Sequence, residues 1–534
     1  MSMRAATNEV KVERDVPVTM PDGVELLTDL FHPVGVDDAP AILERTPYGR
    51  AGISGSGYGP VLAERGYRYV LQASRGTDGS GGSHSYFAEV GDGRATADWI
   101  AEQSWFNGSL GTYGGSYMGY TQWALASTEP PHLKAMAVAL CGSVRRFAWY
   151  PGGSYALEII IPWDMGAVNF NKPQPATTED SLSPEAIARR MAVLQEGFDH
   201  LPLGDAIKHL SGEDLPLYRE QLAHNEPDDP YWSTLDFSPM LATWKVPILL
   251  VDGWQDYQCP RMLDDYVALR AGGTPVWVRI GAGGHIGGGG EGGMTEAPLL
   301  WFDTYLKGMT GLLPERTVTL EVLGEGGGWR DFEAWPPPAS PTPWFLHPSG
   351  RLSTEMPAGA AEPVRYRYDP GDPTPSVGGI GMLTGGQRDN RELEARRDVC
   401  VFTSDALERA LEVIGPVQVD LHVSSSLDHT DFFARVCDVA PDGRSTNVCD
   451  GLQRFTPATI ERATDGSFHA KFSLWPTAYR FAPGHRVRVQ VSSGAHPVYA
   501  RNLGTGESPF TATTWKAADQ AVYHDSSVTL PHAS

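Results

Sequence analysis

A serine in a glycine-rich segment is the first residue of this chain that could carry out covalent chemistry. Leu110–Tyr113 is a short β-type run, Gly114-Gly115-Ser116 follows it directly, and a helical pattern begins at Tyr117. A serine in a tight turn between a strand and a helix exposes its Oγ above the edge of a sheet, where it can attack a carbonyl carbon. The backbone N–H groups that open the helix can stabilise the resulting oxyanion. We therefore predict that Ser116 is a nucleophile.

The glycines around Ser116 differ from the common Gly-x-Ser-x-Gly motif. In that motif the second glycine lies two residues after the serine, whereas this chain has Met118 there and Gly119 one position later. A glycine-rich turn that contains a serine by chance would look similar. The hypothesis therefore depends on whether a base and an acid follow at the expected places.

A serine hydroxyl needs a general base and an acid that orients the base, because it is weakly nucleophilic at neutral pH. In the α/β-hydrolase pattern the acid and then the histidine come later in the chain, each after a strand. Asp256 follows the β-like run Pro247–Val251, and His285 follows the run Val276–Ile280. Asp252 is the alternative acid, but it lies at the strand end, whereas Asp256 follows the turn. We predict that Asp256 and His285 complete the triad.

The elements that must position these residues fall into an α/β region with an insertion. β-type runs alternate with helical patterns over 1–144 and resume over 242–314, which predicts a mostly parallel sheet covered by helices. Residues 145–241 lose the strands. In that stretch Ser183-Pro184 has the N-cap serine and first-turn proline typical of a helix start. We predict a hydrolase-type catalytic domain interrupted by a helical cap.

The C-terminal region, 315–534, has a different periodicity. Short β runs such as Thr317–Leu323 and Gln418–Ser424 are separated by turns rich in Gly, Pro and Asp, and no long helical pattern occurs between them. This pattern predicts an all-β sandwich or jelly roll.

Composition excludes several classes of protein. The 534 residues include 41% hydrophobic and 20% charged residues, which is ordinary globular usage and enough for two or three domains. The formal net charge is −23 and no basic run occurs, so a nucleic-acid-binding surface is not expected. The N-terminus lacks the apolar core of a secretory signal, and no apolar run approaches the roughly 20 residues of a membrane span. We predict a cytoplasmic protein without nucleic-acid or membrane partners.

The cysteines indicate neither a disulfide framework nor a metal site. The five cysteines are scattered and form no C-x-x-C pair, so we expect buried or free thiols. No His, Cys and Asp residues cluster with metal-ligand spacing. We predict no metal and no cofactor.

Taken together, these segments closely resemble the serine hydrolase family that groups cocaine esterases, X-Pro dipeptidyl peptidases, glutaryl-cephalosporin acylases and α-amino-acid ester hydrolases. The resemblance extends from about Val16 to about Thr511, and its markers include Arg45-Thr46-Pro47-Tyr48-Gly49, Gly114 to Tyr120, Gly253-Trp254-Gln255-Asp256 and Gly484-His485-Arg486. It implies an α/β-hydrolase domain, an inserted helical cap and a C-terminal jelly roll of the galactose-binding-like type packed against both. The implied reaction is hydrolysis of a carboxylic ester or amide through an acyl-enzyme.

The resemblance also implies an oxyanion hole made by the backbone N–H of Tyr117 and the hydroxyl of Tyr48. A phenol is a neutral donor at pH 7, so it can replace a second backbone N–H. Without the resemblance, Tyr48 would be interpreted only as an aromatic residue in a turn.

Aromatic residues of the predicted cap and of the Asp256 loop are the candidates for the substrate pocket: Trp149, Tyr150, Trp163 and Trp254. Such a wall suits an apolar or aromatic acyl group, although ordinary core packing of the cap explains the same residues equally well. Glu158 and Asp164 are candidates to bind a substrate amine, but nothing in their spacing is diagnostic.

Two other functions stay open at this point. The first is release of X-Pro dipeptides, which needs a carboxylate in the cap to bind the substrate ammonium group. The second is a non-catalytic binding protein, because jelly rolls often bind sugars and a fold does not determine a function. The expected partner is a small ester, an amide or a short peptide. The oligomeric state is open, with a homo-oligomer as one option.

Overall fold

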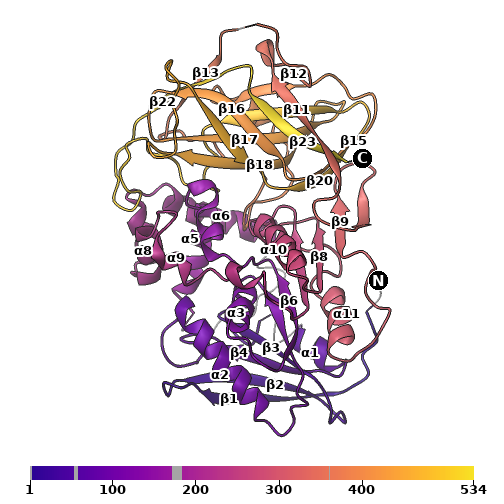
Figure 1. The fold of residues 1–534 in the computed structure, drawn as a ribbon. Coiled ribbons are helices and arrows are strands. Elements are labelled where there is room, and N and C mark those ends of the chain that lie inside the picture. The colour runs from indigo at the N-terminus through magenta and orange to yellow at the C-terminus, as the bar shows by residue number, and fades with distance from the viewer. Residues whose placement is uncertain (1–2, 53–57, 171–182, 360, 534) are drawn as a thin grey trace.

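The structure is a computed structural model that describes residues 3–52, 58–170, 183–359 and 361–533. Two segments of the predicted units, 53–57 of the catalytic domain and 171–182 of the cap, lie outside these residues. Figure 1 shows the α/β region at the bottom, a group of helices in the middle and the C-terminal sheets at the top.

The α/β region is built on a ten-stranded mixed sheet. Its strand order is β1-β2-β4-β3-β5-β6-β7-β8-β9-β10, and all neighbours from β4 to β9 pair in parallel. The strands are β1 (Val10–Thr19), β2 (Glu25–Pro33), β3 (Ala41–Thr46), β4 (Arg68–Ala73), β5 (Leu110–Gly115), β6 (Leu133–Ala139), β7 (Ile248–Gly253), β8 (Val276–Gly281), β9 (Val318–Val322) and β10 (Gly328–Phe332). Strands β3, β4, β5 and β7 are buried along their whole length, as expected for parallel strands covered on both faces.

One strand belongs to a different sheet from the one predicted. The sequence places the run Thr317–Leu323 in the predicted C-terminal β region, but β9 pairs in parallel with β8, with Val278 opposite Val318. Strand β10 then pairs antiparallel with β9 and forms the edge of the sheet. A short alternating run has the same pattern in a sandwich and at a sheet edge, so only the pairing partner distinguishes the two.

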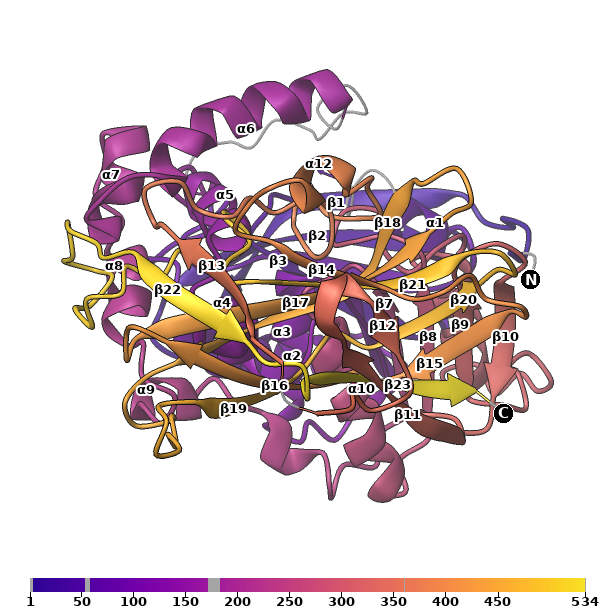
Figure 2. The ribbon, with the colours of Figure 1, turned by 90° about the horizontal axis from the view of Figure 1, so that it is seen from above.

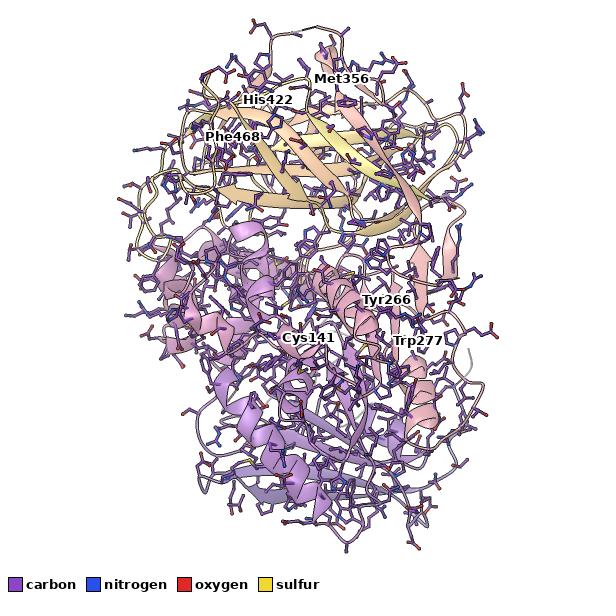
Figure 3. The ribbon with its side chains drawn as sticks, viewed as in Figure 1. Cys141, Tyr266, Trp277, Met356, His422 and Phe468 are labelled. Atoms are coloured by element: carbon purple, nitrogen blue, oxygen red, sulfur yellow. The ribbon has the colours of Figure 1, made fainter. Side chains whose placement is uncertain are left out.

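Helices cover both faces of this sheet. They are α1 (Gly59–Ala63), α2 (Glu89–Ala101), α3 (Tyr117–Ala126), α10 (Cys259–Ala271) and α11 (Glu296–Tyr305). Side chains of α1 and α11 share one apolar core with Trp277 of β8, whereas α2, α3 and α10 contribute to another core that includes Tyr266. Figure 3 labels Trp277 and Tyr266. The arrangement is the doubly covered sheet that the βαβ alternation predicts.

The predicted cap region is helical. It contains α4 (Arg145–Trp149), α5 (Leu157–Ala167), α6 (Pro184–Phe198), α7 (Ala206–Ser211), α8 (Pro216–Ala223) and α9 (Pro230–Ser233). The predicted start of α6 is confirmed: the Ser183 side chain accepts a hydrogen bond from the N–H of Ala186, at 3.2 Å. Figure 1 shows α5, α6, α8 and α9 between the α/β region and the C-terminal sheets.

The C-terminal region is a stack of antiparallel sheets. The larger sheet contains β11 (Ala339–Leu346), β12 (Leu352–Ser353), β13 (Val364–Tyr368), β15 (Leu411–Gly415), β16 (Gln418–Ser425), β19 (Phe468–Ser473), β20 (Thr477–Phe481), β22 (Ala518–Val522) and β23 (Ser527–Ala533). The smaller sheet contains β14 (Cys400–Thr403), β17 (Thr430–Val439), β18 (Ser445–Phe455) and β21 (Arg486–Ser492), and a short helix, α12 (Arg391–Glu394), precedes β14. In Figure 2 these strands overlie the α/β region, and α6 lies beside them.

Alternation along the strands explains the stacking. On β19 buried and exposed residues alternate strictly, and Phe468 points into the core, whereas His422 of the paired strand β16 is only partly buried. Both residues are labelled in Figure 3. The alternation of β19 is what the period of two predicts, whereas β17 of the smaller sheet is buried along its whole length.

Two further observations concern the whole chain. All five cysteines are free and buried. Within the described residues, no helix combines the length and the apolar character needed to cross a bilayer.

Candidate active site

Ser116 occupies a sharp turn between β5 and α3. It is the N-cap residue of α3 and has φ 59° and ψ −124°, a backbone conformation that residues with a Cβ rarely adopt. The two flanking glycines make the turn possible. A Cβ on Gly114 would lie 2.4 Å from the Cβ of Met118, and a Cβ on Gly119 would lie 2.5 Å from the Cβ of Cys141. The displaced glycine is therefore required where α3 packs against the end of β6.

The structure brings the three predicted triad residues together at the carboxyl ends of β5, β7 and β8. His285 Nε2 lies 2.8 Å from Ser116 Oγ, and His285 Nδ1 lies 2.6 Å from Asp256 Oδ2. The other oxygen of Asp256 accepts a hydrogen bond from the N–H of Gln258, at 2.6 Å. This is the geometry in which a histidine can take the serine proton while a carboxylate holds the imidazole in place.

In the described part of the chain, the alternative acid, Asp252, forms no hydrogen bond with His285. Its Oδ1 accepts a hydrogen bond from the N–H of Gly253, at 2.7 Å, and its Oδ2 is buried without a partner. Burial, reinforced by the negative charge of Asp256, raises the pKa of Asp252 well above its usual range. Asp252 is therefore a buried structural acid beside the triad.

The two predicted oxyanion donors lie on the other side of the serine. The hydroxyl of Tyr48 is 3.4 Å from Ser116 Oγ and accepts a hydrogen bond from the indole N–H of Trp163, at 3.1 Å. That bond leaves the proton of the Tyr48 hydroxyl available to a substrate. Tyr117 is the first residue of α3, so its N–H has no carbonyl acceptor within the helix.

A narrow cavity adjoins the serine. It is lined by Ser116, Tyr117, Arg145, Trp149, Ile159, Ile160, Trp163, Tyr257, Gln258 and Met382. Its free volume is about 10 Å³, room for roughly one water molecule. Most of the wall is apolar, and α4, α5 and a segment of the C-terminal region close it.

Two of the four predicted pocket residues line this cavity and two do not. Trp149 and Trp163 face it. Tyr150 instead donates a hydrogen bond to the carbonyl of Gln221, and Trp254 donates one to the carbonyl of Glu321. Aromatic composition indicates a pocket region, but it does not say which way each ring points.

Six cavity residues are not among the sequence predictions: Arg145, Ile159, Ile160, Tyr257, Gln258 and Met382. Three of them are instructive. Tyr257 stacks on the ring of His285 with a centroid separation of 4.6 Å, and its place directly after Asp256 was a usable signal. Arg145 lies four residues before Trp149, one helical turn away. Met382 comes from the C-terminal region, and nothing in the sequence connects it with Ser116.

Glu158 explains how Met382 reaches the cavity. Its buried carboxylate accepts hydrogen bonds from the backbone N–H groups of Met382, Leu383 and Thr384, at 3.0, 2.9 and 2.9 Å, and from the Thr384 hydroxyl, at 3.2 Å. A carboxylate of α5 thus binds a loop of the C-terminal region. These donors engage both oxygens of the carboxylate, and the role of Glu158 in binding a substrate amine stays a prediction.

Asp164, the other candidate for binding an amine, is buried and does not line the cavity. Neither of its carboxyl oxygens has a hydrogen-bond partner. Burial raises its pKa well above the usual range. Across the described part of the chain, no group of three or more His, Cys, Asp or Glu side chains could hold a metal ion.

Nearly the whole chain is similar to known proteins. A family model described as X-Pro dipeptidyl-peptidase (S15 family) matches residues 22–287, and one described as the X-Pro dipeptidyl-peptidase C-terminal non-catalytic domain matches residues 311–529. The cocaine esterase of Rhodococcus sp. (strain MB1 Bresler) is 31% identical over 93% of each chain. The chain belongs to the X-Pro dipeptidyl-peptidase (S15) family.

Solved structures of this family's fold support the same conclusion. An α-amino acid ester hydrolase superposes with a TM-score of 0.83 at 25% identity, over 100% of this chain and 98% of that one. An aminopeptidase from a marine sediment archaeon, Thaumarchaeota archaeon, has the same fold, with a TM-score of 0.82 at 22% identity over 98% and 96% of the two chains. The predicted fold class is confirmed, and the protein is a serine hydrolase of the S15 family.

Proposed function

We propose that this enzyme hydrolyses small carboxylic esters through an acyl-enzyme on Ser116. His285 takes the proton of the serine hydroxyl as Oγ attacks the acyl carbon, and it then gives that proton to the leaving alcohol. Asp256 holds the imidazole and stabilises its charged form. Water repeats the sequence and releases the acid. The observation that carries this proposal is the pair of distances at His285, 2.8 Å to Ser116 Oγ and 2.6 Å to Asp256 Oδ2.

The proposed oxyanion hole consists of the Tyr117 N–H and the Tyr48 hydroxyl. Two donors aimed at the developing negative charge stabilise the tetrahedral intermediate more than the ground-state carbonyl. The 3.4 Å distance from the Tyr48 hydroxyl to Ser116 Oγ supports this role, because the oxyanion forms next to the attacking oxygen.

The narrow cavity supports a small acyl group. The cavity has free volume for roughly one water molecule. An acetyl or propionyl group therefore forces the lining side chains to move less than a benzoyl group does. Among esters with an uncharged acyl group, we therefore expect kcat/KM to fall as that group becomes bulkier.

Release of X-Pro dipeptides is the alternative, and the description of the matching family model favours it. That reaction needs a negative group for the substrate ammonium. Of the two candidate carboxylates, Glu158 binds a backbone loop, and Asp164 does not line the cavity. The charged side chain that does line it is Arg145, which repels a cation. The site therefore favours an ester over an X-Pro peptide.

A substrate panel on the purified enzyme tests the choice. We expect turnover of p-nitrophenyl acetate and propionate, slower turnover of the benzoate, and little turnover of Gly-Pro or Ala-Pro p-nitroanilide. A fluorophosphonate probe should label the wild-type enzyme but not Ser116→Ala. Faster hydrolysis of the X-Pro anilides than of every ester would reverse the assignment.

Three predictions about the chain as a whole stay predictions. They are the domain limits (1–144 with 242–314, 145–241 and 315–534), the cytoplasmic location and the option of a homo-oligomer. Size-exclusion chromatography with light scattering tests the last of these.

A further inference from the structure

Arg145 places a positive charge inside the cavity beside Ser116. It is the first residue of α4, its side chain lines the cavity, and the residue is only 7% exposed. Its guanidinium lies 3.8 Å from the ring centroid of Trp149 and 4.4 Å from that of Tyr86. Its Nη2 donates a hydrogen bond to the Tyr86 hydroxyl, at 2.7 Å. The aromatic rings hold the guanidinium in one position without neutralising it.

This buried cation lacks the carboxylate partner that two other buried arginines, Arg45 and Arg435, have. Arg45 pairs with Glu89 at 2.5 Å, and Arg435 pairs with Asp450 at 2.8 Å. Among the described residues, Arg145 forms no ion pair, and its Nε–H has no hydrogen-bond partner. A buried, unpaired charge is costly, so its persistence at a catalytic cavity points to a ligand group that pairs with it.

The neighbouring titratable groups leave this charge uncompensated. The carboxyl of Asp164 interacts with Arg145 electrostatically, but burial raises the pKa of Asp164 well above its usual range, which favours the neutral acid. The Glu158 carboxylate is engaged by the Met382–Thr384 loop. Burial and the charge of Arg145 lower the pKa of His84 to about 4, so this imidazole is neutral. Arg145 therefore makes the cavity electropositive.

We propose that Arg145 binds a carboxylate on the acyl part of the substrate, so that the preferred substrates are monoesters of short dicarboxylic acids. This inference rests on the proposed esterase function and specifies its substrate class. The cavity adjoins Ser116 and is lined by residues of α4 and α5 and by Met382, so we place in it the acyl part of the substrate, which stays on Ser116 after the alcohol leaves. A carboxylate accepts charge-assisted hydrogen bonds from the guanidinium, and an apolar acyl chain of equal length leaves that group unpaired.

Matched ester pairs test the inference on the wild-type enzyme. Monoethyl succinate and monoethyl glutarate are compared with ethyl butyrate and ethyl valerate by titration of released acid in a pH-stat. We expect kcat/KM to be about 10- to 100-fold higher for the anionic member of at least one pair, the gain typical of a charge-assisted hydrogen bond in a desolvated site. Equal or lower values for both anionic esters overturn the inference.

Substitutions assign the preference to Arg145. Arg145→Met should reduce the ratio of kcat/KM for the anionic ester over the neutral ester to about one. Arg146→Met is the matched control: Arg146 is the adjacent arginine, packs on Tyr150 and donates to the carbonyl of Asn225, away from the cavity. This variant should keep the wild-type ratio. A preference that survives Arg145→Met contradicts the assignment.

A binding measurement keeps the inference testable if Arg145→Met does not fold. Free glutarate should protect wild-type Ser116 from fluorophosphonate labelling at lower concentrations than valerate does, and equal protection by the two acids overturns the inference. The neutral esters separate the two levels of failure. If they are hydrolysed without an anionic preference, only the substrate class is wrong. If no ester is hydrolysed and Ser116 is not labelled, the proposed function fails and the inference fails with it.

Discussion

At the scale of single residues, the site depends on a serine in a backbone conformation that suits glycine. The φ of 59° at Ser116 positions Oγ between His285 and the Tyr48 hydroxyl. Strain of this kind costs on the order of 1–3 kcal/mol and persists where the surrounding structure enforces it. We therefore expect the proposed nucleophile to lower the folding stability of the enzyme.

This strain can be measured with two inactive variants. Ser116→Ala and Ser116→Gly both lack Oγ, so both should lose activity by about 10⁴-fold or more. Ser116→Gly should nevertheless be the more stable of the two by about 1 kcal/mol, because glycine adopts this φ without strain. Thermal or urea unfolding measures the difference. A less stable glycine variant would show that the turn is not strained.

The identity of the triad acid leads to a paired prediction. Asp256→Asn should lower kcat by about 10³–10⁴-fold, since an amide cannot stabilise the imidazolium of His285. Asp252→Asn should cost less than about tenfold, because that buried carboxyl already favours its neutral form and touches Gly253 rather than His285. Steady-state kinetics on both variants, with circular dichroism as a folding control, decides the matter. The opposite ranking would transfer the role to Asp252.

Tyr48 tests the oxyanion hole. Tyr48→Phe keeps the ring and removes only the oxygen, so kcat should fall by about 10²–10³-fold while KM changes little. Fluorophosphonate labelling should slow as well, because that reaction also develops negative charge on an oxygen. Trp163→Phe, which removes the N–H that donates to this hydroxyl, is the milder companion variant. A normal kcat for Tyr48→Phe would mean that another group is the second donor.

At the scale of elements, α5 connects the catalytic cavity with the C-terminal region. One face of this helix supplies Ile159, Ile160 and Trp163 to the cavity wall, and Glu158 binds the loop that carries Met382. The backbone of α5 also contacts the C-terminal region, because the N–H of Glu158 donates a hydrogen bond to the carbonyl of Pro497. Helix α5 and a loop of the C-terminal region therefore form one wall of the site.

Replacing Glu158 should loosen that wall. Glu158→Gln has one acceptor oxygen, whereas the four donors of the Met382–Thr384 loop now share two. We therefore expect the free energy of unfolding to fall by about 2 kcal/mol and Met382 to move. KM for acetyl and propionyl esters should rise more than kcat falls, and bulkier acyl groups should be discriminated against less. Thr384→Val, which removes one of the four hydrogen bonds, should show the same changes at smaller size. Wild-type chain-length preference in Glu158→Gln would contradict this positioning role.

At the scale of the whole molecule, the three regions share one apolar core. The largest cluster of buried side chains contains Leu30 of the α/β region, Ile160 of the cap region and Leu530 of the last strand. Backbone hydrogen bonds cross the same boundaries, for example from the N–H of Leu203 to the carbonyl of Pro509 and from the N–H of Leu323 to the carbonyl of Ala478. Such continuity couples the stability of each region to that of its neighbours.

We therefore expect the chain to unfold in one cooperative transition despite its length. Loss of activity, tryptophan fluorescence and far-UV circular dichroism should share one midpoint in urea. Independent domains would instead give separate midpoints, with the β-rich signal persisting after activity is lost. The measurement should be made under reducing conditions, since all five cysteines are free.

The sequence by itself determined the order and type of the elements and the place of the triad. Ser116, Asp256 and His285 could be predicted because each follows a recognisable strand, and parallel strands bring their carboxyl ends to one edge of the sheet. Periodicity also separated the α/β region, the helical insertion and the β region. These features are local, so they can be recognised from short windows of sequence.

Only the tertiary structure decided which distant residues complete the site. It assigned β9 to the sheet of β8, directed Tyr150 and Trp254 away from the cavity, and brought Arg145 and Met382 to it. Each of these outcomes depends on strand partners or helix orientations set by packing over long sequence separations. A pattern of residue types shows which face of an element is apolar, but it does not show what that face will meet.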